Sequence, residues 1–175
     1  MVTKNQKLTV LAFIEISIES SIKYEYEEAT GRLVVNRFLH TSMHYPFNYG
    51  FIPGTISEDK DPLDILVLTL KQILPGTYLP VRIIGMLETE DEQGKDIKMI
   101  GVPADSVDPE SEKIQNLLNL SQLTKDRIGH FFEYYKSLEK DKWVKVKQWH
   151  GKDESLQYLE KCYINKDDKK NALKL

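Results

Sequence analysis

Short apolar runs separated by turn residues dominate the first two-thirds of the chain. The runs are rich in Val, Ile and Leu, and they predict β-strands at Val10–Ile18, Leu33–Phe38, Asp64–Leu70, Leu79–Glu88 and Ile97–Val102. Between them lie turn residues that include Gly31, Gly54, Gly76 and Gly94. Short strands at this spacing favour a closed or partly closed barrel over a parallel α/β sheet.

The periodicity changes after Pro109. Within 123–138 the apolar residues recur at three- and four-residue spacing, which predicts an amphipathic helix: Leu123, Ile128, Phe131, Phe132, Tyr135 and Leu138. A short β-like run, Trp143–Trp149, and a second helix, Glu154–Tyr163, follow, and we expect the charged tail from 166 to 175 to be frayed. The chain is therefore predicted to be one α+β domain over 1–175, mainly β, with about two helices.

Composition limits the classes of function. The 175 residues include 24 Lys and Arg against 27 Asp and Glu, a net charge of −3, which argues against a nucleic-acid binder that depends on bulk positive charge. The single cysteine, Cys162, cannot form an internal disulfide, which fits a reducing cytosol. The apolar run before Glu15 could pass for a secretory signal peptide, but no small-residue cleavage site follows it. No apolar run approaches the roughly 20 residues needed to span a bilayer. We expect a cytoplasmic protein without a membrane segment.

Three aspartates lie close together where a turn enters an apolar strand, in Asp59-Lys60-Asp61-Pro62-Leu63-Asp64. Pro62 fixes its own φ and drives Asp61 towards an extended conformation, so the turn is stiff. Holding three like charges together costs electrostatic energy, which a bound cation would remove, and oxygen ligands favour hard ions such as Mg²⁺, Mn²⁺ or Ca²⁺. A solvated acidic turn is the alternative. A calcium EF-hand does not fit, because Asp64 and Leu70 stand where that loop has Gly and Glu.

A second acidic group lies in Asp91-Glu92-Gln93-Gly94-Lys95-Asp96-Ile97-Lys98, which reads as a hairpin with Gly94 in the turn. Asp96 and Lys98 share a strand face because they are two residues apart. By itself this is an ordinary charged hairpin, and its meaning depends on whether it meets the first acidic group.

Cations and aromatic residues supply candidate anion contacts. Lys23 and Glu25 share a strand face, and Arg37 lies in an apolar strand where its charge needs solvent or a partner. Tyr135 and Lys136 are adjacent near the end of the predicted helix. Each of these has a plainer interpretation as a surface ion pair. The segment 45–54, with Tyr45 and Tyr49, reads as a loop unusually rich in aromatic rings. Tyrosine hydroxyls can donate to phosphate, the rings can plug one end of the barrel, and one side chain can do both.

Taken in order, these motifs resemble family I soluble inorganic pyrophosphatases. Asp59 to Asp64 is similar to the family's D-x-D-P-x-D signature, and companion motifs follow the family's order from Glu15 to Trp149: Ile14-Glu15-Ile16, Lys23-Tyr24-Glu25, Arg37-Phe38, Tyr45-Pro46, Asn48-Tyr49-Gly50, the 91–98 hairpin, His130-Phe131-Phe132 and Tyr135-Lys136. The resemblance implies an OB-like five-stranded β-barrel with packed helices. It also implies hydrolysis of pyrophosphate to two phosphates with Mg²⁺, or Mn²⁺ as a substitute, in a homo-oligomer, often a hexamer.

The resemblance also implies roles for individual residues. Metal ions would be held by Asp59, Asp64, Asp91, Asp96 and Glu25, with Glu15 and Glu92 in the outer shell. Asp61 matches the general base, and Lys23, Arg37, Lys98, Tyr135 and Lys136 match the phosphate contacts, with Tyr45 and Tyr49 lining the cleft. Of these, Asp61, Arg37, Tyr49 and Lys136 are the expected catalytic residues.

Three positions depart from the family pattern. Lys60 stands where glycine is common, Phe51 where tyrosine is common, and Ser17 where proline is frequent. The alternative functions are a non-catalytic OB-type module that binds nucleic acid or another polyanion, and a structural calcium-binding module. Against the first, the acidic residues predicted for the cleft would repel a phosphate backbone unless metal ions intervene.

Overall fold

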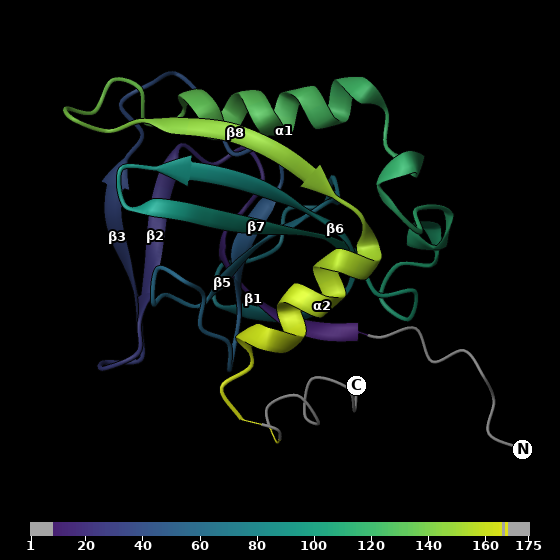
Figure 1. Cartoon of the computed structure of the whole chain (residues 1–175). Coiled ribbons are helices and arrows are strands. Elements are labelled where there is room, and N and C mark those ends of the chain that lie inside the picture. Colours follow the sequence, from purple (N-terminus) through teal and green to yellow (C-terminus); the bar gives the residue numbers. More distant parts are fainter. Residues whose placement is uncertain (1–8, 166, 168–175) are drawn as a thin grey trace, which may run out of the picture.

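The computed structural model describes residues 9–165 and residue 167 (Figure 1). In chain order its elements are β1 (Thr9–Ile16), β2 (Ile22–Glu27), β3 (Arg32–Phe38), β4 (Asn48–Ile52), β5 (Leu63–Val67), β6 (Thr77–Asp91), β7 (Gly94–Pro103), the 3₁₀ helices η1 (Pro109–Lys113) and η2 (Leu117–Asn119), α1 (Gln122–Tyr134), β8 (Val144–His150) and α2 (Lys152–Cys162). None of the helices in these residues is long and apolar enough to cross a membrane.

Five strands close into a ring in the order β1-β4-β5-β7-β6, because β1 also pairs with β6. All of these pairings are antiparallel except β5 with β7. Outside the ring, β8 continues the sheet from β6, and β2 and β3 form a separate two-stranded sheet. The predicted mainly-β α+β class with a five-stranded barrel and packed helices is confirmed.

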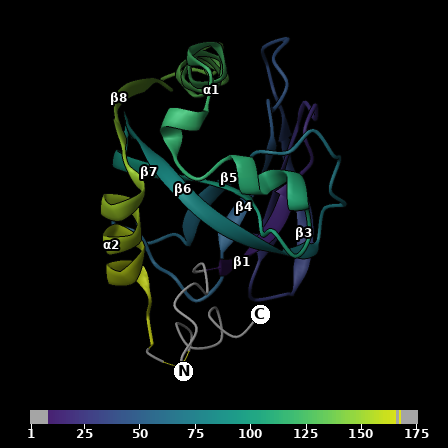
Figure 2. The ribbon, with the colours of Figure 1, turned by 90° about the vertical axis from the view of Figure 1, so that its right-hand side faces the viewer.

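The two faces of the ring strands pack into two apolar clusters. On β7, Ile97 and Met99 belong to a cluster that α2 completes with Leu159, whereas Ile100 and Val102 belong to a cluster under α1. Figure 2 shows α1 and α2 on different sides of the ring. This alternation follows from the two-residue period of a strand. One face is buried by the five ring strands together with α2, and the other is covered by α1.

Close backbone packing at one corner of the ring requires glycine. A Cβ added at Gly50 on β4 would lie 1.8 Å from the carbonyl oxygen of Phe13 on β1. Any other residue would therefore force the two strands apart. This contact holds together the strands that carry Tyr49 and Glu15.

Two sequence expectations need correction. The aromatic segment 45–54 was expected to be a loop, but it contains β4, whose five residues are all buried. Its Asn and Gly residues are typical of turns, and the strand is stabilised by pairing with β1 and β5 on either side. The helix expected over 123–138 ends at Tyr134, and turns follow. Apart from residue 167, the tail expected to be frayed lies outside the described residues.

Candidate functional site

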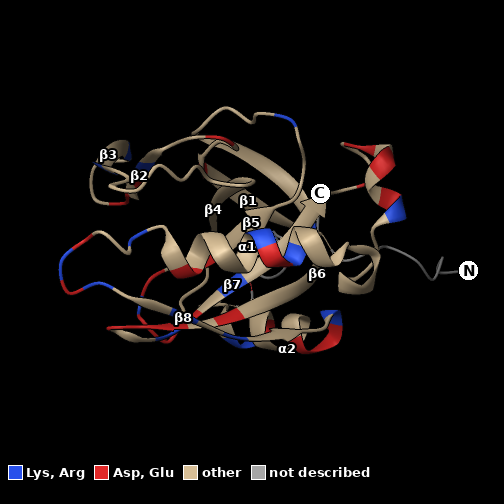
Figure 3. Ribbon diagram, turned by 90° about the horizontal axis from the view of Figure 1, so that it is seen from above, with Lys and Arg blue, Asp and Glu red and all other residues tan. Residues whose placement is uncertain are grey.

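One pocket of about 570 Å³ lies between the β2–β3 sheet, the acidic turn 59–64, the β6–β7 hairpin and the end of α1. Seen from above, β2, β3 and the loop between α1 and β8 lie at the same end of the molecule (Figure 3). The pocket is lined by every site residue expected from the sequence: Glu15, Lys23, Glu25, Arg37, Tyr45, Tyr49, Asp59, Asp61, Asp64, Asp91, Glu92, Asp96, Lys98, Tyr135 and Lys136. The fold therefore brings together groups that are up to 121 residues apart in the chain, between Glu15 and Lys136.

The acidic turn is closed by its own backbone. The Ser57 amide donates to the Asp61 carbonyl at 2.8 Å, and the Asp61 amide donates to Oδ1 of Asp59 at 3.0 Å. Lys60 between them has a φ of 71°, in the left-handed region. Burial, together with the nearby carboxylates of Asp96, Asp64 and Asp61, raises the pKa of Asp59 even though the Asp61 amide opposes the shift. The turn thus presents Asp59 and Asp61 to the pocket at an electrostatic cost.

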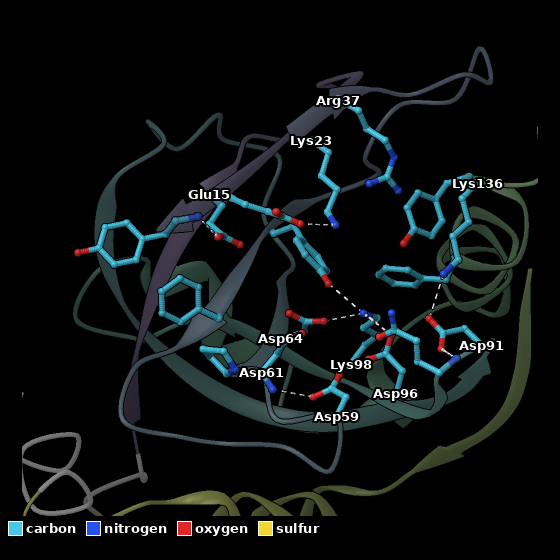
Figure 4. Close-up of a pocket in the computed structure, with 18 of the residues that line it drawn as sticks. Glu15, Lys23, Arg37, Asp59, Asp61, Asp64, Asp91, Asp96, Lys98 and Lys136 are labelled. Atoms are coloured by element: carbon cyan, nitrogen blue, oxygen red, sulfur yellow. Dashed lines mark hydrogen bonds and ion pairs between the residues drawn. The ribbon is translucent and has the colours of Figure 1, made fainter. Parts of the chain in front are cut away.

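Asp64 and Asp96 share one buried cation. Asp64 on β5 lies opposite Lys98 on β7 in the parallel register, and Nζ of Lys98 is 2.6 Å from Oδ2 of Asp64. The same Nζ lies 2.9 Å from Oδ2 of Asp96 and donates to the Tyr49 hydroxyl at 3.0 Å (Figure 4). Burial disfavours the charge of Lys98, but the two carboxylates outweigh it and raise its pKa well above the usual value. Burial also raises the pKa of Asp96, against the effect of Lys98.

The β6–β7 hairpin is tied to the end of α1 by charge. Nζ of Lys136 lies 3.0 Å from Oδ2 of Asp91 and 3.3 Å from Oε1 of Glu92. Glu92 also accepts from Lys142 at 3.0 Å and from the Trp143 amide at 3.3 Å. Although burial acts in the opposite direction, these donors lower the pKa of Glu92 to about 2. Lys142 was not expected from the sequence, because nothing in its local pattern distinguishes it from a surface lysine.

The opposite wall carries cations on the β2–β3 sheet. Lys23 and Glu25 form an ion pair at 2.8 Å, as their shared strand face predicts. Arg37 on β3 lies 2.9 Å from Oε1 of Glu139, a partner that the sequence did not indicate. In Figure 4 Lys23 and Arg37 both point into the pocket towards the aspartates.

Glu15 connects this wall to the ring. Its Oε1 accepts from the Tyr26 amide at 2.8 Å, so a β1 side chain fixes the position of β2. Burial raises the pKa of Glu15, and this effect outweighs the opposite effect of the hydrogen bond from the Tyr26 amide. The resulting pKa is about 7. The carboxyl group therefore sits behind Lys23 and Glu25 as a support for the wall.

Aromatic rings form the floor of the pocket. Tyr45 is 2% exposed and packs against Tyr49, Phe131 and Tyr135. Tyr45 therefore fills the space between β4 and α1, in the apolar cluster under α1. Tyr49 also offers its hydroxyl to the pocket through the bond with Lys98.

The chemistry of the lining fits hard cations. Nine carboxylates line the pocket with six lysine and arginine side chains, and the potential metal donors among them are all oxygens. Among the described residues no three potential metal-ligating groups converge as they stand, and Lys98 and Lys136 pair with three of the aspartates, Asp64, Asp96 and Asp91. The excess of carboxylates over cations and the mutual repulsion of Asp59, Asp64 and Asp96 favour binding of divalent ions.

Comparison with known proteins identifies the family of the chain. The family model described as inorganic pyrophosphatase matches residues 12–166. The inorganic pyrophosphatase of Sulfolobus acidocaldarius is 51% identical over 83% of this chain and 84% of its own length, and that of Aquifex pyrophilus is 46% identical over 93% and 92%. The solved inorganic pyrophosphatase of Helicobacter pylori superposes with a TM-score of 0.88 at 41% identity, covering 93% of this chain and 96% of the other.

These relatives are pyrophosphatases rather than nucleic-acid-binding or calcium-binding modules, so they favour hydrolysis of pyrophosphate over either alternative. The match to the family model covers residues 12–166, far more of the chain than the aspartate motif alone. The chain belongs to the inorganic pyrophosphatase family.

Proposed function

We propose that this pocket hydrolyses inorganic pyrophosphate to two phosphates with Mg²⁺ as cofactor, or Mn²⁺ in its place. The observation that carries the proposal is the arrangement of charge. Carboxylates of the acidic turn and hairpin face Lys23 and Arg37 across a single pocket, with Lys98 and Lys136 among the carboxylates. Pyrophosphate with bound cations needs both kinds of contact, because it carries several negative charges of its own.

The carboxylates are the proposed metal ligands. Asp59, Asp64 and Asp96 would hold one ion, Asp91 and Asp96 another, and Glu25 a further one. Glu15 and Glu92 would support them from the outer shell, through the Tyr26 amide and through Lys136 and Lys142. When bound, divalent ions supply Lewis acidity, which neutralises phosphate oxygens and makes water a stronger acid.

Asp61 is the proposed general base. Its carboxylate lies on the exposed side of the acidic turn, next to Asp59, while the backbone hydrogen bonds of the turn fix its position. From there it can accept a proton from the attacking water and orient that water for in-line attack. The water attacks directly, so no side chain becomes covalently attached to phosphorus.

The cations and tyrosines are the proposed phosphate contacts. Lys23 and Arg37 would bind from the β2–β3 wall, and Lys98, Lys136 and Tyr135 from the opposite side, with Tyr45 and Tyr49 below. Their charges stabilise the leaving phosphate as negative charge develops on it. Arg37, Tyr49 and Lys136 therefore join Asp61 as the proposed catalytic residues.

Asp61→Asn tests the role of the general base. The amide keeps the shape of the side chain but cannot take a proton, so we expect kcat in saturating Mg²⁺ to fall by roughly one order of magnitude or more. Glu58→Gln is the matched control, because Glu58 lies on the same turn with its side chain 59% exposed and is not among the proposed ligands. Near-normal phosphate release by Asp61→Asn would show that another group accepts the proton.

The resemblance also supports three wider proposals: that 1–175 is a single domain, that the protein acts in the cytoplasm, and that it assembles as a homo-oligomer, a hexamer in the form common among family members of this length. Light scattering coupled to size-exclusion chromatography would measure the assembly directly.

A further inference from the structure

The loop between α1 and β8, residues 135–143, connects the two walls of the pocket. Its backbone is shaped by tight turns, in which the Glu139 amide donates to the Lys136 carbonyl at 3.0 Å and the Lys142 amide donates to the Glu139 carbonyl at 3.3 Å. Figure 3 shows that both acidic and basic residues lie along it. Lys136 and Lys142 reach the acidic hairpin, whereas Glu139 reaches the β2–β3 sheet, so each wall receives the opposite charge.

The contact of this loop with the β2–β3 sheet is a largely buried ion pair. Nε of Arg37 lies 2.9 Å from Oε1 of Glu139, and the two side chains are only 24% and 10% exposed. Neither Nε of Arg37 nor Oε2 of Glu139 completes a hydrogen bond with any described residue. Charge rather than a directed hydrogen bond therefore holds the pair together, and poor solvation makes that charge effective.

A second set of contacts links the Arg37 side chain, through Asn36, to another carboxylate that could attract it in the absence of Glu139. Its Nη1 donates to Oδ1 of Asn36 at 2.7 Å, and Nδ2 of Asn36 donates to Oε2 of Glu25 at 2.9 Å. Glu25 is thus the neighbouring carboxylate on the same sheet, and Lys23 already pairs with it. Without Glu139, the guanidinium group would be drawn towards Glu25, away from the position it now holds.

We propose that Glu139 is a positioning residue for Arg37. Its carboxylate holds the guanidinium group from the side of the α1–β8 loop, so that Arg37 meets the substrate phosphate in one orientation. This inference rests on the proposed function, because it assigns Glu139 to the same reaction. It adds a residue that does not line the pocket and acts only through another side chain.

Steady-state kinetics of Glu139 variants test the proposal. Glu139→Gln keeps the shape and removes the charge, so we expect kcat for pyrophosphate to fall about tenfold, as it does when a binding group is misplaced. The KM for pyrophosphate and the Mg²⁺ concentration for half-maximal rate should each change less than about threefold, because the substrate still binds and the metal ligands are untouched. Glu139→Asp, which keeps the charge, should retain at least about a third of kcat.

A double-mutant cycle isolates the path through Arg37. A lysine ammonium group has no planar, directed set of donors that Glu139 could orient. In an Arg37→Lys background, Glu139→Gln should therefore lower kcat less than about twofold. Leu138→Ala is the control for the loop, since Leu138 is a neighbouring residue with 68% exposure, and it should leave kcat unchanged. The thermal unfolding temperature of each variant shows whether the substitution has destabilised the protein.

Three results would overturn the inference alone: wild-type kcat in Glu139→Gln, the full tenfold loss persisting in the Arg37→Lys background, or a raised Mg²⁺ requirement that accompanies the loss. The last would mean that Glu139 merely braces the loop and, through it, the metal site. Absence of pyrophosphate hydrolysis by the wild-type protein would instead remove the proposed function, and this inference with it.

Discussion

Lys60 is the residue where sequence and backbone conflict most directly. It has a φ of 71°, a conformation that costs a non-glycine residue about 1–2 kcal/mol. The strain explains why glycine suits this position of the motif: glycine adopts positive φ without a clash. Glu19, with a φ of 68°, adopts the same region, and so does Asp141 in the α1–β8 loop with a φ of 59°, although aspartate tolerates it better.

Lys60→Gly should therefore stabilise the metal-free protein. Relief of strain outweighs the extra entropy of glycine in the unfolded chain, which leaves a gain of about 0.5–1 kcal/mol in the free energy of unfolding. Urea titration in EDTA measures it. Lys60→Gln is the control, because it removes the charge and keeps the strain, and it should show no such gain. Equal stability of the two variants would mean that charge, not backbone conformation, sets the effect.

Some residue-level contacts could be predicted from the sequence and others could not. Asp96 with Lys98 and Lys23 with Glu25 follow from two-residue spacing on a strand, and both are ion pairs in the structure. The bond between Lys98 and Asp64 depends on the parallel register of β5 and β7, which no local pattern encodes. The pairing of Arg37 with Glu139 likewise depends on how a loop folds back across the pocket.

At the scale of elements, the junction of β8 and α2 is held by His150. Its Nδ1 lies 2.7 Å from Oε2 of Glu154 on α2, and its Nε2 lies 2.8 Å from Oε2 of Glu88 on β6. Burial disfavours the imidazolium form, but the two carboxylates outweigh burial and raise the pKa of His150. The ring thus connects the helix to the sheet most strongly when it is protonated.

His150→Gln should lower stability in a pH-dependent way. Because the folded-state pKa is raised, the stabilisation is fully present below the unfolded value of about 6.5 and is lost as the pH rises through the folded value. The difference in unfolding free energy from wild type should therefore be larger at about pH 6 than at about pH 9. Glu88→Gln should reproduce part of this slope. A difference that is constant across the range would show that packing, not charge, accounts for His150.

Helices and strands could be predicted where the spacing of apolar residues showed a clear helical or strand period. Six strands and both α-helices were expected near their observed positions, with the run Trp143–Trp149 corresponding to β8, because alternating or helical apolar spacing extends over most of them. The strand β4 was missed, since its sequence Asn-Tyr-Gly-Phe-Ile contains two turn-forming residues, and only pairing on both sides makes it a strand. Closure of the ring by β1 and β6 is equally non-local.

At the scale of the whole molecule, the fold concentrates charged side chains at one end of the ring. A chain with a net charge of only −3 gathers nine carboxylates and six cations around one pocket, at the end of the ring where β2–β3, the hairpin and the α1–β8 loop meet. Tertiary structure, rather than composition, creates this local charge. The order of the motifs along the chain made the pocket's residues predictable, whereas its bracing by Glu139 and Lys142 became visible only in three dimensions.

The most direct test of the account is phosphate release from pyrophosphate, compared with release from ATP and from a simple phosphomonoester, each with Mg²⁺ and with EDTA. We expect rapid release from pyrophosphate in Mg²⁺, little from the other two substrates, and loss of the pyrophosphate activity in EDTA. Turnover that persists in EDTA, or that shows no preference for pyrophosphate, would contradict the proposed function.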